Sequence, residues 1–318
     1  MRRAIAERFA MNHSQPRRPI LRTLVPLSAC LLLALPAHAQ EPDPAAHSLA
    51  PHRLTTPPVG RTTFDVDPVV DGAIVTVTFG FAGILDLVNS TGEIRPQQIS
   101  PTFNEDDLLG IDRSAVSQTV DRNASNYSNY GLAAAVVFAM VDPVLSGLRE
   151  RDVQSAIADA FMYAESTSVA YGLTNITKMA VRRPRPKAYM AARASQDPNY
   201  SNSDTDSSLS FFSGHAALVS AIGGTATYLA FARSPNTARP WLTLAASSAL
   251  TGFVSYERVR AGAHFPTDVI AASIAGMGVG VIVPHLHRSG SIEQRRIWMG
   301  FAPVDRGEGG SLELGGSF

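Results

Sequence analysis

A histidine and an aspartate in the second half of the chain have the types and spacing needed for nucleophilic chemistry. His264 precedes Asp268 by four residues, and Pro266 between them suits the first turn of a helix. The Asp268 carboxylate could therefore reach back to one ring N–H of His264, fix its tautomer and leave the other nitrogen as a nucleophile. Arg258 lies six residues earlier and adds a cation. The competing interpretation is a capping box beside a buried histidine.

A second histidine stands at the expected start of a long apolar helix. His215 follows Ser213, a natural N-cap, and Gly214, which allows a ligand to approach the backbone closely. The free N–H groups of a first helical turn bind anions, and His215 would stand at the edge of that site, able to exchange a proton. The alternative is an ordinary serine cap with an incidental histidine.

A basic segment precedes these motifs. Its cations are Lys178, Arg182, Arg183, Arg185 and Lys187. Lys178 is expected near the end of a helix, and Pro184 and Pro186 are expected to impose an extended exit. A point-charge lysine and a forked arginine on one rigid turn suit phosphate oxygens. By itself, such a segment is also typical of a helix-dipole partner or a solvated face.

Taken together and in this order, the motifs resemble those of the PAP2 and vanadium haloperoxidase superfamily. That family is defined by K-x6-RP, then PSGH, then SR-x5-H-x3-D, and the chain resembles it from about residue 124 to 286. The resemblance implies an all-α fold with a single bundle of about six helices. Two positions depart from the pattern. Phe212 replaces the proline, and Glu257 replaces the serine and could reduce the effective charge of Arg258.

The resemblance also implies a metal-independent phosphatase that needs no cofactor. The implied phosphate-binding residues are Lys178, Arg185, Ser213, Gly214 and Arg258. His264 would attack phosphorus and become a phosphohistidine, oriented by Asp268. His215 would protonate the leaving oxygen and then activate water. The expected substrate is a lipid phosphate, an isoprenoid diphosphate or a soluble monoester, because all three present the same phosphoryl end.

Two other functions remain open at this stage. In a vanadate-dependent haloperoxidase, the same cradle would hold vanadate with His264 as its ligand. In a non-catalytic envelope binding protein, the fold would be kept without turnover. No Asp/His pattern with convincing metal-ligand spacing stands out, and His285-x-His287 is interpreted as a feature of a helix end.

Residues 1–39 have the features of an export signal. An arginine-rich start precedes an apolar run at 24–35 and the small-x-small site Ala37-His38-Ala39, so we expect cleavage before Gln40. A lipoprotein cleaved at Cys30, the chain's single cysteine, is the alternative. The signal contains six of the 27 basic and one of the 27 acidic residues, which leaves 21 basic and 26 acidic residues. That balance argues against a nucleic-acid partner.

The remaining sequence divides into three parts. Residues 40–70 are predicted to be a flexible linker, and 71–290 a helical phosphatase domain whose first helix is capped by Asp71. Alternating apolar residues in the tail, 291–318, are typical of a short hairpin. The predicted helices after the first lie at 124–148, 153–182, 214–232, 240–258 and 266–286.

The apolar runs of these helices are interrupted, for example by Asp142-Pro143. This favours a soluble or membrane-surface-associated bundle in the periplasm or cell envelope over an integral inner-membrane protein.

Overall fold

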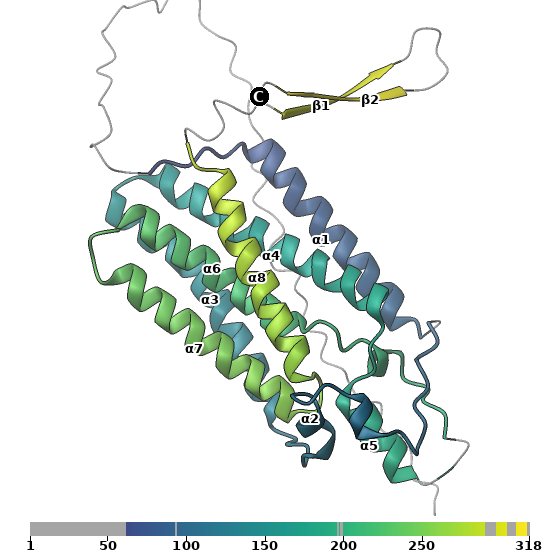
Figure 1. The fold of residues 1–318 in the computed structure, drawn as a ribbon. Helices are drawn as coiled ribbons and strands as arrows, with labels where there is room; N and C mark the ends of the chain where they lie inside the picture. The colour runs from purple at the N-terminus through teal and green to yellow at the C-terminus, as the bar shows by residue number, and fades with distance from the viewer. Residues whose placement is uncertain are drawn as a thin grey trace, which may run out of the picture. The chain divides into compact units, whose positions relative to one another are not determined.

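The computed structural model describes residues 62–92, 94–195, 197 and 200–289, together with two strands at 297–303 and 310–316. Six helices of at least 20 residues form a bundle in this part of the chain, as the sequence predicted (Figure 1). They are α1 (Pro68–Ser90), α3 (Ala124–Glu150), α4 (Val153–Val181), α6 (Gly214–Arg233), α7 (Arg239–Arg260) and α8 (Pro266–Leu286). The predicted export signal, the linker up to residue 61 and the rest of the tail lie outside the described residues.

Shorter elements connect the long helices. The helices α2 (Arg113–Ser117) and α5 (Pro186–Ser195) and the 3₁₀ turns η2 (Glu105–Asp107) and η3 (Thr205–Ser208) lie in the connections. In the tail, β1 (Ile297–Pro303) pairs with β2 (Gly310–Gly316) as an antiparallel hairpin, with Met299 opposite Leu314. The hairpin that the alternating tail sequence indicated is therefore formed.

The helix α6 lies at the centre of the bundle and contacts α3, α4, α7 and α8. Its approach to α8 is closest at two glycines. A Cβ on Gly276 would lie 2.1 Å from the Ala217 carbonyl oxygen, and one on Gly280 would lie 2.2 Å from the Ala221 carbonyl oxygen. Only glycine permits this contact. Because the paired positions advance together, α6 and α8 run parallel and begin at the same end of the bundle.

The start of α1 differs from the prediction. Asp67, not Asp71, is the N-cap, and its Oδ1 accepts hydrogen bonds from the N–H groups of Val69 (2.9 Å) and Val70 (3.2 Å). Pro68 occupies the first helical position, where its missing N–H costs nothing. Asp71 instead lies buried in the first turn.

Two prolines behave differently from the prediction. The helix α3 continues through Pro143 rather than breaking there, because its contacts with α4, α6 and α7 hold it in place. Pro186 does not extend the exit from α4 but begins α5. Pro186 occupies a first helical position, where proline is tolerated, whereas Pro143 lies in a helix interior and depends on the surrounding packing.

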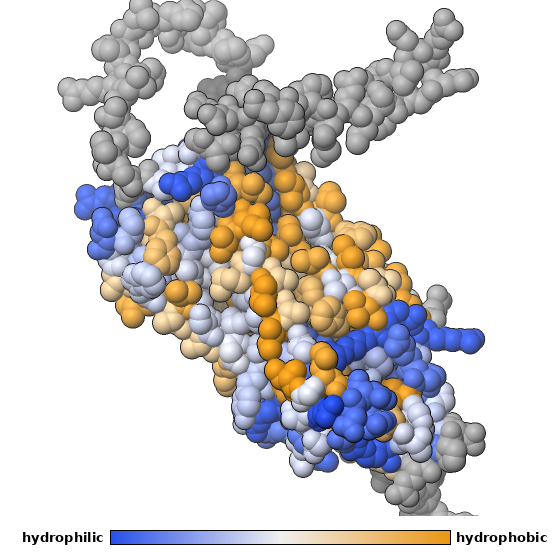
Figure 2. Space-filling view, in the orientation of Figure 1, coloured by the Kyte–Doolittle hydropathy of each residue, from blue (hydrophilic) through white to orange (hydrophobic). Residues whose placement is uncertain are grey.

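Four helices, α1, α3, α6 and α8, are long and apolar enough to cross a membrane. Only 11% of the apolar window of α1 and 28% of that of α3 is buried inside the protein, whereas the α6 window is 72% buried. Figure 2 shows apolar residues spread over the face where α1 and α8 lie in Figure 1. Soluble monomers rarely expose apolar patches of this extent. The finding supports the integral-membrane alternative over the soluble bundle that the interrupted sequence pattern favoured.

Candidate active site

The three sequence motifs meet where α4 ends and where α6 and α8 begin. The backbone N–H of Ser213 donates to the Asp268 carbonyl oxygen (3.4 Å). The Lys178 ammonium, from the last turn of α4, lies 3.8 Å from the position that a Cβ on Gly214 would occupy. Residues up to 90 positions apart in the sequence therefore share one end of the bundle.

The start of α6 offers donors to an anion. Ser213 is fully buried and caps the helix, its Oγ accepting from the Ala216 N–H at 3.5 Å. A Cβ on Gly214 would lie 3.3 Å from Cγ2 of Thr174, so a side chain there would crowd the space in front of the helix. The positive end of the helix dipole and the nearby Lys178 ammonium both favour a negative ligand.

The His264 ring is held by a backbone carbonyl rather than by Asp268. Its Nδ1 lies 2.7 Å from the Ser210 carbonyl oxygen and 3.9 Å from Oδ2 of Asp268. Since a carbonyl oxygen can only accept, Nδ1 carries the ring proton and Nε2 keeps a lone pair. The ring N–H therefore donates to the Ser210 carbonyl and not, as predicted, to the Asp268 carboxylate, although the expected tautomer is obtained.

The environment of His264 favours the neutral imidazole. The side chain is 2% exposed. Burial lowers its pKa well below the usual range, and the positive charges of Arg258, Arg185 and Lys178 lower it further. A neutral ring with a free nitrogen next to three cations is the state that a nucleophile for a phosphate group needs.

Asp268 instead organises the turn that carries His264. Its Oδ2 accepts from the Phe265 N–H (2.9 Å) and from the Ser210 hydroxyl, and its Oδ1 accepts from Nη1 of Arg183 (2.5 Å). The first of these bonds caps α8, as the alternative interpretation of the motif proposed. Asp268 thus acts on His264 through Ser210, whose side chain it binds and whose carbonyl holds the ring.

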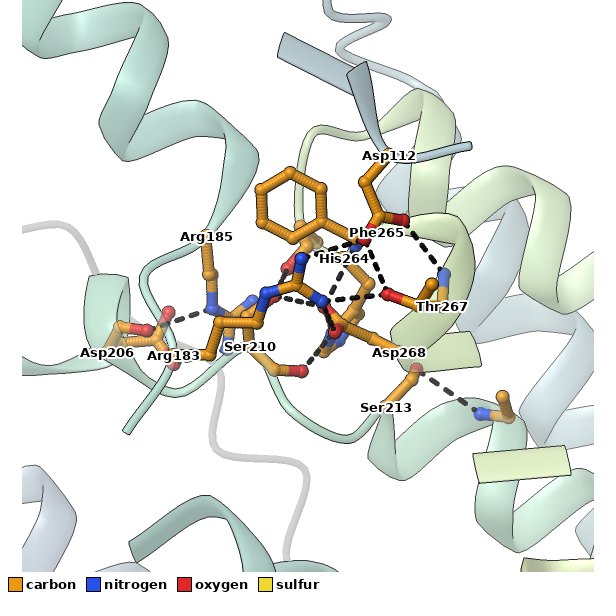
Figure 3. Close-up of polar contacts among 12 residues, drawn as sticks. Asp112, Arg183, Arg185, Asp206, Ser210, Ser213, His264, Phe265, Thr267 and Asp268 are labelled. Atoms are coloured by element: carbon orange, nitrogen blue, oxygen red, sulfur yellow. Dashed lines mark hydrogen bonds and ion pairs between the residues drawn. The ribbon is translucent and has the colours of Figure 1, made fainter. Parts of the chain in front are cut away.

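A buried ion-pair network supports Asp268 (Figure 3). Nη2 of Arg183 donates to Oδ2 of Asp112 (2.8 Å), and its guanidinium lies 4.0 Å from the centre of the Phe265 ring. Thr267 closes the network, because its N–H and hydroxyl both donate to Asp112 (3.0 and 2.7 Å). Both carboxylates are fully buried. The Arg183 guanidinium therefore bonds to other side chains of the protein and is not available to bind a substrate.

Arg258 has few such partners. It is 9% exposed, its Nη1 makes one long hydrogen bond to Ser128 (3.5 Å), and its Nε has no hydrogen-bond partner within the described residues. Glu257, which could reduce the effective charge of Arg258, pairs with Arg260 at 3.1 Å. A buried guanidinium with unused donors is well suited to receive an anion.

Arg185 is partly occupied. Its Nη2 donates to Oδ1 of Asp206 (2.6 Å) and its Nε donates to the backbone carbonyl of the same residue (2.8 Å). Lys187 approaches the other carboxylate oxygen at 3.5 Å, and the Asp206 side chain is 54% exposed. A phosphate group at Arg185 would therefore share the guanidinium with Asp206 or displace its carboxylate.

His215 has a partner that the sequence did not indicate. Its Nε2 lies 2.8 Å from Oδ1 of Asn129, which projects from α3. This contact holds the ring at the start of α6, beside the predicted anion site. The sequence analysis did not identify three residues of this site, because each lies outside the three motifs: Asn129, Asp112 and Ser210. Arg183 alone stood in a recognised basic segment.

Comparison with known proteins finds a family model over the region that carries the motifs. The model of the PAP2 superfamily matches residues 159–290, a range that contains all three motifs. A crystal structure described as the first transmembrane PAP2 type phosphatidylglycerolphosphate phosphatase, from Bacillus subtilis, is similar with a TM-score of 0.41 and 16% identity. That alignment covers 68% of this chain and 94% of the other. No curated protein matches. Residues 159–290, which carry the ordered motifs at one end of the helical bundle, match the PAP2 superfamily.

Proposed function

We propose that this protein is a phosphatase of the PAP2 type that works through a phosphohistidine. The match of residues 159–290 to the superfamily supports hydrolysis of phosphoric esters in general. The observation that carries the finer proposal is the state of His264, a neutral ring whose Nδ1 donates to the Ser210 carbonyl and whose Nε2 is free beside three cations.

The reaction has two balanced steps. In the first, the lone pair on Nε2 of His264 attacks phosphorus, the bond from phosphorus to the leaving oxygen breaks, and the protonated His215 ring gives that oxygen a proton. Burial and the positive charges of Arg258, Lys178 and Arg185 lower the pKa of His215 to about 3, so the negative charge of the bound phosphate must raise it for this step. In the second, His215 takes a proton from water, the hydroxide attacks the phosphohistidine, and inorganic phosphate leaves with His264 restored. Asn129 positions His215 for both proton transfers.

Positively charged side chains and N–H or O–H donors of the protein are proposed to stabilise the negative charge on the transferred phosphoryl group. The groups proposed to bind the equatorial oxygens are Lys178, Arg185, Arg258, the Ser213 hydroxyl and the Gly214 N–H. Fixed cations in a buried site stabilise a phosphoryl transition state without the reorganisation that water would require. In this proposal they do the work that metal ions perform in other phosphatases.

The substrate proposed is a phosphate or diphosphate on an apolar tail. Four helices that are long and apolar enough to span a membrane support a lipid environment for the bundle. A lipid phosphate or isoprenoid diphosphate would then reach the site by lateral diffusion. A panel of such esters and soluble monoesters, assayed with purified protein in detergent, tests this. Faster turnover of the soluble monoesters would contradict it.

Export, with cleavage before Gln40, remains part of the proposal.

Turnover should continue in excess EDTA and should be inhibited competitively by vanadate, because cations of the protein bind the phosphoryl oxygens. The check is steady-state kinetics in detergent, at a temperature well below the melting midpoint so that stability effects do not interfere. Loss of turnover that Mg²⁺ or Zn²⁺ restores would contradict the proposed mechanism. Bromide oxidation by peroxide with added vanadate, measured in parallel, distinguishes the haloperoxidase alternative.

His264 should remain neutral when the pH falls through 6.5, the ordinary histidine pKa. Its lowered pKa means that the ring binds a proton only in more acidic solution, so the nucleophile persists at mildly acid pH. Nitrogen NMR of the imidazoles checks this, with the His264 signal assigned by its absence in His264→Gln. In Arg258→Gln the pKa should rise, since one of the neighbouring positive charges is removed. Protonation of wild-type His264 at or above pH 6.5 would refute the expectation.

A further inference from the structure

Three ionisable side chains from distant parts of the sequence meet far from the candidate active site. Asp71 lies in the first turn of α1, Glu165 lies within α4, and His287 is the C-cap residue of α8. One ligand atom of each lies within 4.8 Å of the other two. Nε2 of His287 lies 3.4 Å from Oδ1 of Asp71 and 3.4 Å from Oε2 of Glu165.

The hydrogen bonds around this cluster direct acceptor atoms toward a common point. Nδ1 of His287 lies 2.9 Å from the Val283 carbonyl oxygen and must therefore donate to it, which turns Nε2 toward the carboxylates. Oδ2 of Asp71 accepts from the Asp67 N–H at 2.8 Å, which leaves Oδ1 for the cluster. An imidazole fixed by a backbone carbonyl at one nitrogen is the usual arrangement for a metal ligand at the other.

Glu165 gives an independent indication of a ligand. The residue is 8% exposed, and its Oε2 is buried without a hydrogen-bond partner within the described residues. A carboxylate oxygen in such a place is costly unless a cation or a donor balances it. The distance of 3.4 Å to Nε2 of His287 is too long for a good hydrogen bond but suits two atoms that share one ion.

The surrounding backbone holds the three groups in place. The Asp65 N–H donates to the His287 carbonyl (2.8 Å), and the Ser289 N–H donates to the Thr63 carbonyl (2.9 Å). These bonds fasten the segment before α1 to the end of α8, and Figure 1 shows the two ends side by side. Thr78 of α1 donates to Ser168 of α4 at 2.7 Å, which fixes the other helix pair.

We propose that Asp71, Glu165 and His287 bind one divalent transition-metal ion, for which Zn²⁺ fits best. Zinc bonds to nitrogen and oxygen of about 2.0–2.1 Å in a tetrahedron place the ligand atoms roughly 3.4 Å apart, which matches the separation of Nε2 of His287 from both carboxylate oxygens. A water molecule completes the four ligands. The nitrogen ligand disfavours Mg²⁺ and Ca²⁺.

This ion would act as a structural clamp and take no part in the chemistry. It joins α1, α4 and α8, while His264 lies beyond the opposite end of α8. A helix of 21 residues is about 30 Å long, so the two sites are independent. The sequence did not indicate such a site, because its ligands are separated by about a hundred residues and lack a spacing motif.

The test uses the full chain, purified in detergent without a metal-binding tag and stripped with EDTA. Titration with Zn²⁺ should show one equivalent bound and a rise in melting temperature, and Co²⁺ should give the absorption bands of a four-coordinate ion. Glu165→Gln and His287→Gln should each weaken Zn²⁺ binding by about 100-fold or more and leave phosphatase turnover below the melting temperature unchanged. The matched controls His285→Gln and Asp65→Asn alter an exposed neighbouring histidine and carboxylate and should bind Zn²⁺ normally.

Two results would overturn the proposal. The first is substoichiometric Zn²⁺ binding by the stripped wild-type chain with no rise in melting temperature. That result would leave the cluster as a pair of carboxylates around a protonated histidine. The second is Zn²⁺ binding that the two ligand variants do not weaken, which would place the ion elsewhere. Should either variant fail to fold, the Co²⁺ spectrum and the metal stoichiometry of the wild type still test whether the chain binds one four-coordinate ion.

Discussion

Replacing His264 with alanine should abolish phosphoenzyme formation with every substrate. The substitution removes Nε2, the ring nitrogen that does not bond to the Ser210 carbonyl. The described site offers no second nucleophile in its place. Loss of a covalent nucleophile typically slows turnover by about 10⁶-fold. The measurement is radioactive phosphate incorporated during turnover, quenched and tested for the acid lability and base stability of a phosphohistidine.

The His215→Ala variant should fail differently. It lacks the proton donor for the leaving oxygen and the base for the water step, but it keeps the nucleophile. With an activated ester, whose leaving group needs little protonation, this variant should still become labelled at His264 and should lose the label slowly. His285→Ala, at the far end of α8, is the control and should behave as wild type in this assay. Label on His264→Ala together with none on His215→Ala would reverse the two roles.

The Asp268→Asn variant should fall between the two histidine variants in turnover. The loss of turnover is expected because Asp268 organises the turn that carries His264, not because it touches the imidazole. An amide at this position keeps an acceptor for the Phe265 N–H but weakens the charged bond to Arg183 and the bond from Ser210. If none of the three substitutions changes turnover, the assignment of catalytic roles fails.

The Arg183→Gln variant should be destabilised by about 3–5 kcal/mol, because it leaves two fully buried carboxylates without their shared cation. The guanidinium bonds to Asp112 and Asp268 and lies over the Phe265 ring, so glutamine loses charge, hydrogen bonds and a stacking contact. The measurement is the unfolding free energy in mild detergent. Arg193→Gln removes a half-exposed ion pair with Glu105 and should change stability by less than about 1 kcal/mol.

A double variant separates charge from packing in this network. Adding Asp112→Asn to Arg183→Gln removes one of the uncompensated charges and should restore part of the lost stability. The two substitutions together should lower the free energy of unfolding by less than the sum of their separate effects. Additive losses would show that Arg183 acts mainly through packing on Phe265. An Arg183→Gln variant as stable as Arg193→Gln would contradict the network itself.

The sequence alone determined the helices and the identity of the groups that carry the proposed chemistry. Apolar periodicity and local start signals act within a few residues, so the predicted starts at 124, 153, 214 and 266 are confirmed. Ser213 is the cap of α6 as predicted. The family resemblance also came from sequence, because its motifs are short segments with fixed internal spacing.

The tertiary structure alone decided which groups contact one another. Asp268 lies four residues after His264, a spacing that permits contact but does not require it. The carboxylate turns instead to its own helix start and to Arg183, and Ser210 takes its place at the ring. Asp112 reaches the network from an element that no motif marked.

The cluster of Asp71, Glu165 and His287 and the exposure of apolar helices to their surroundings were likewise invisible in the sequence. Each depends on how separate helices are placed side by side. Spacing along the chain reports contacts only within one element, whereas burial and charge pairing depend on neighbours that the fold brings from far away in the sequence.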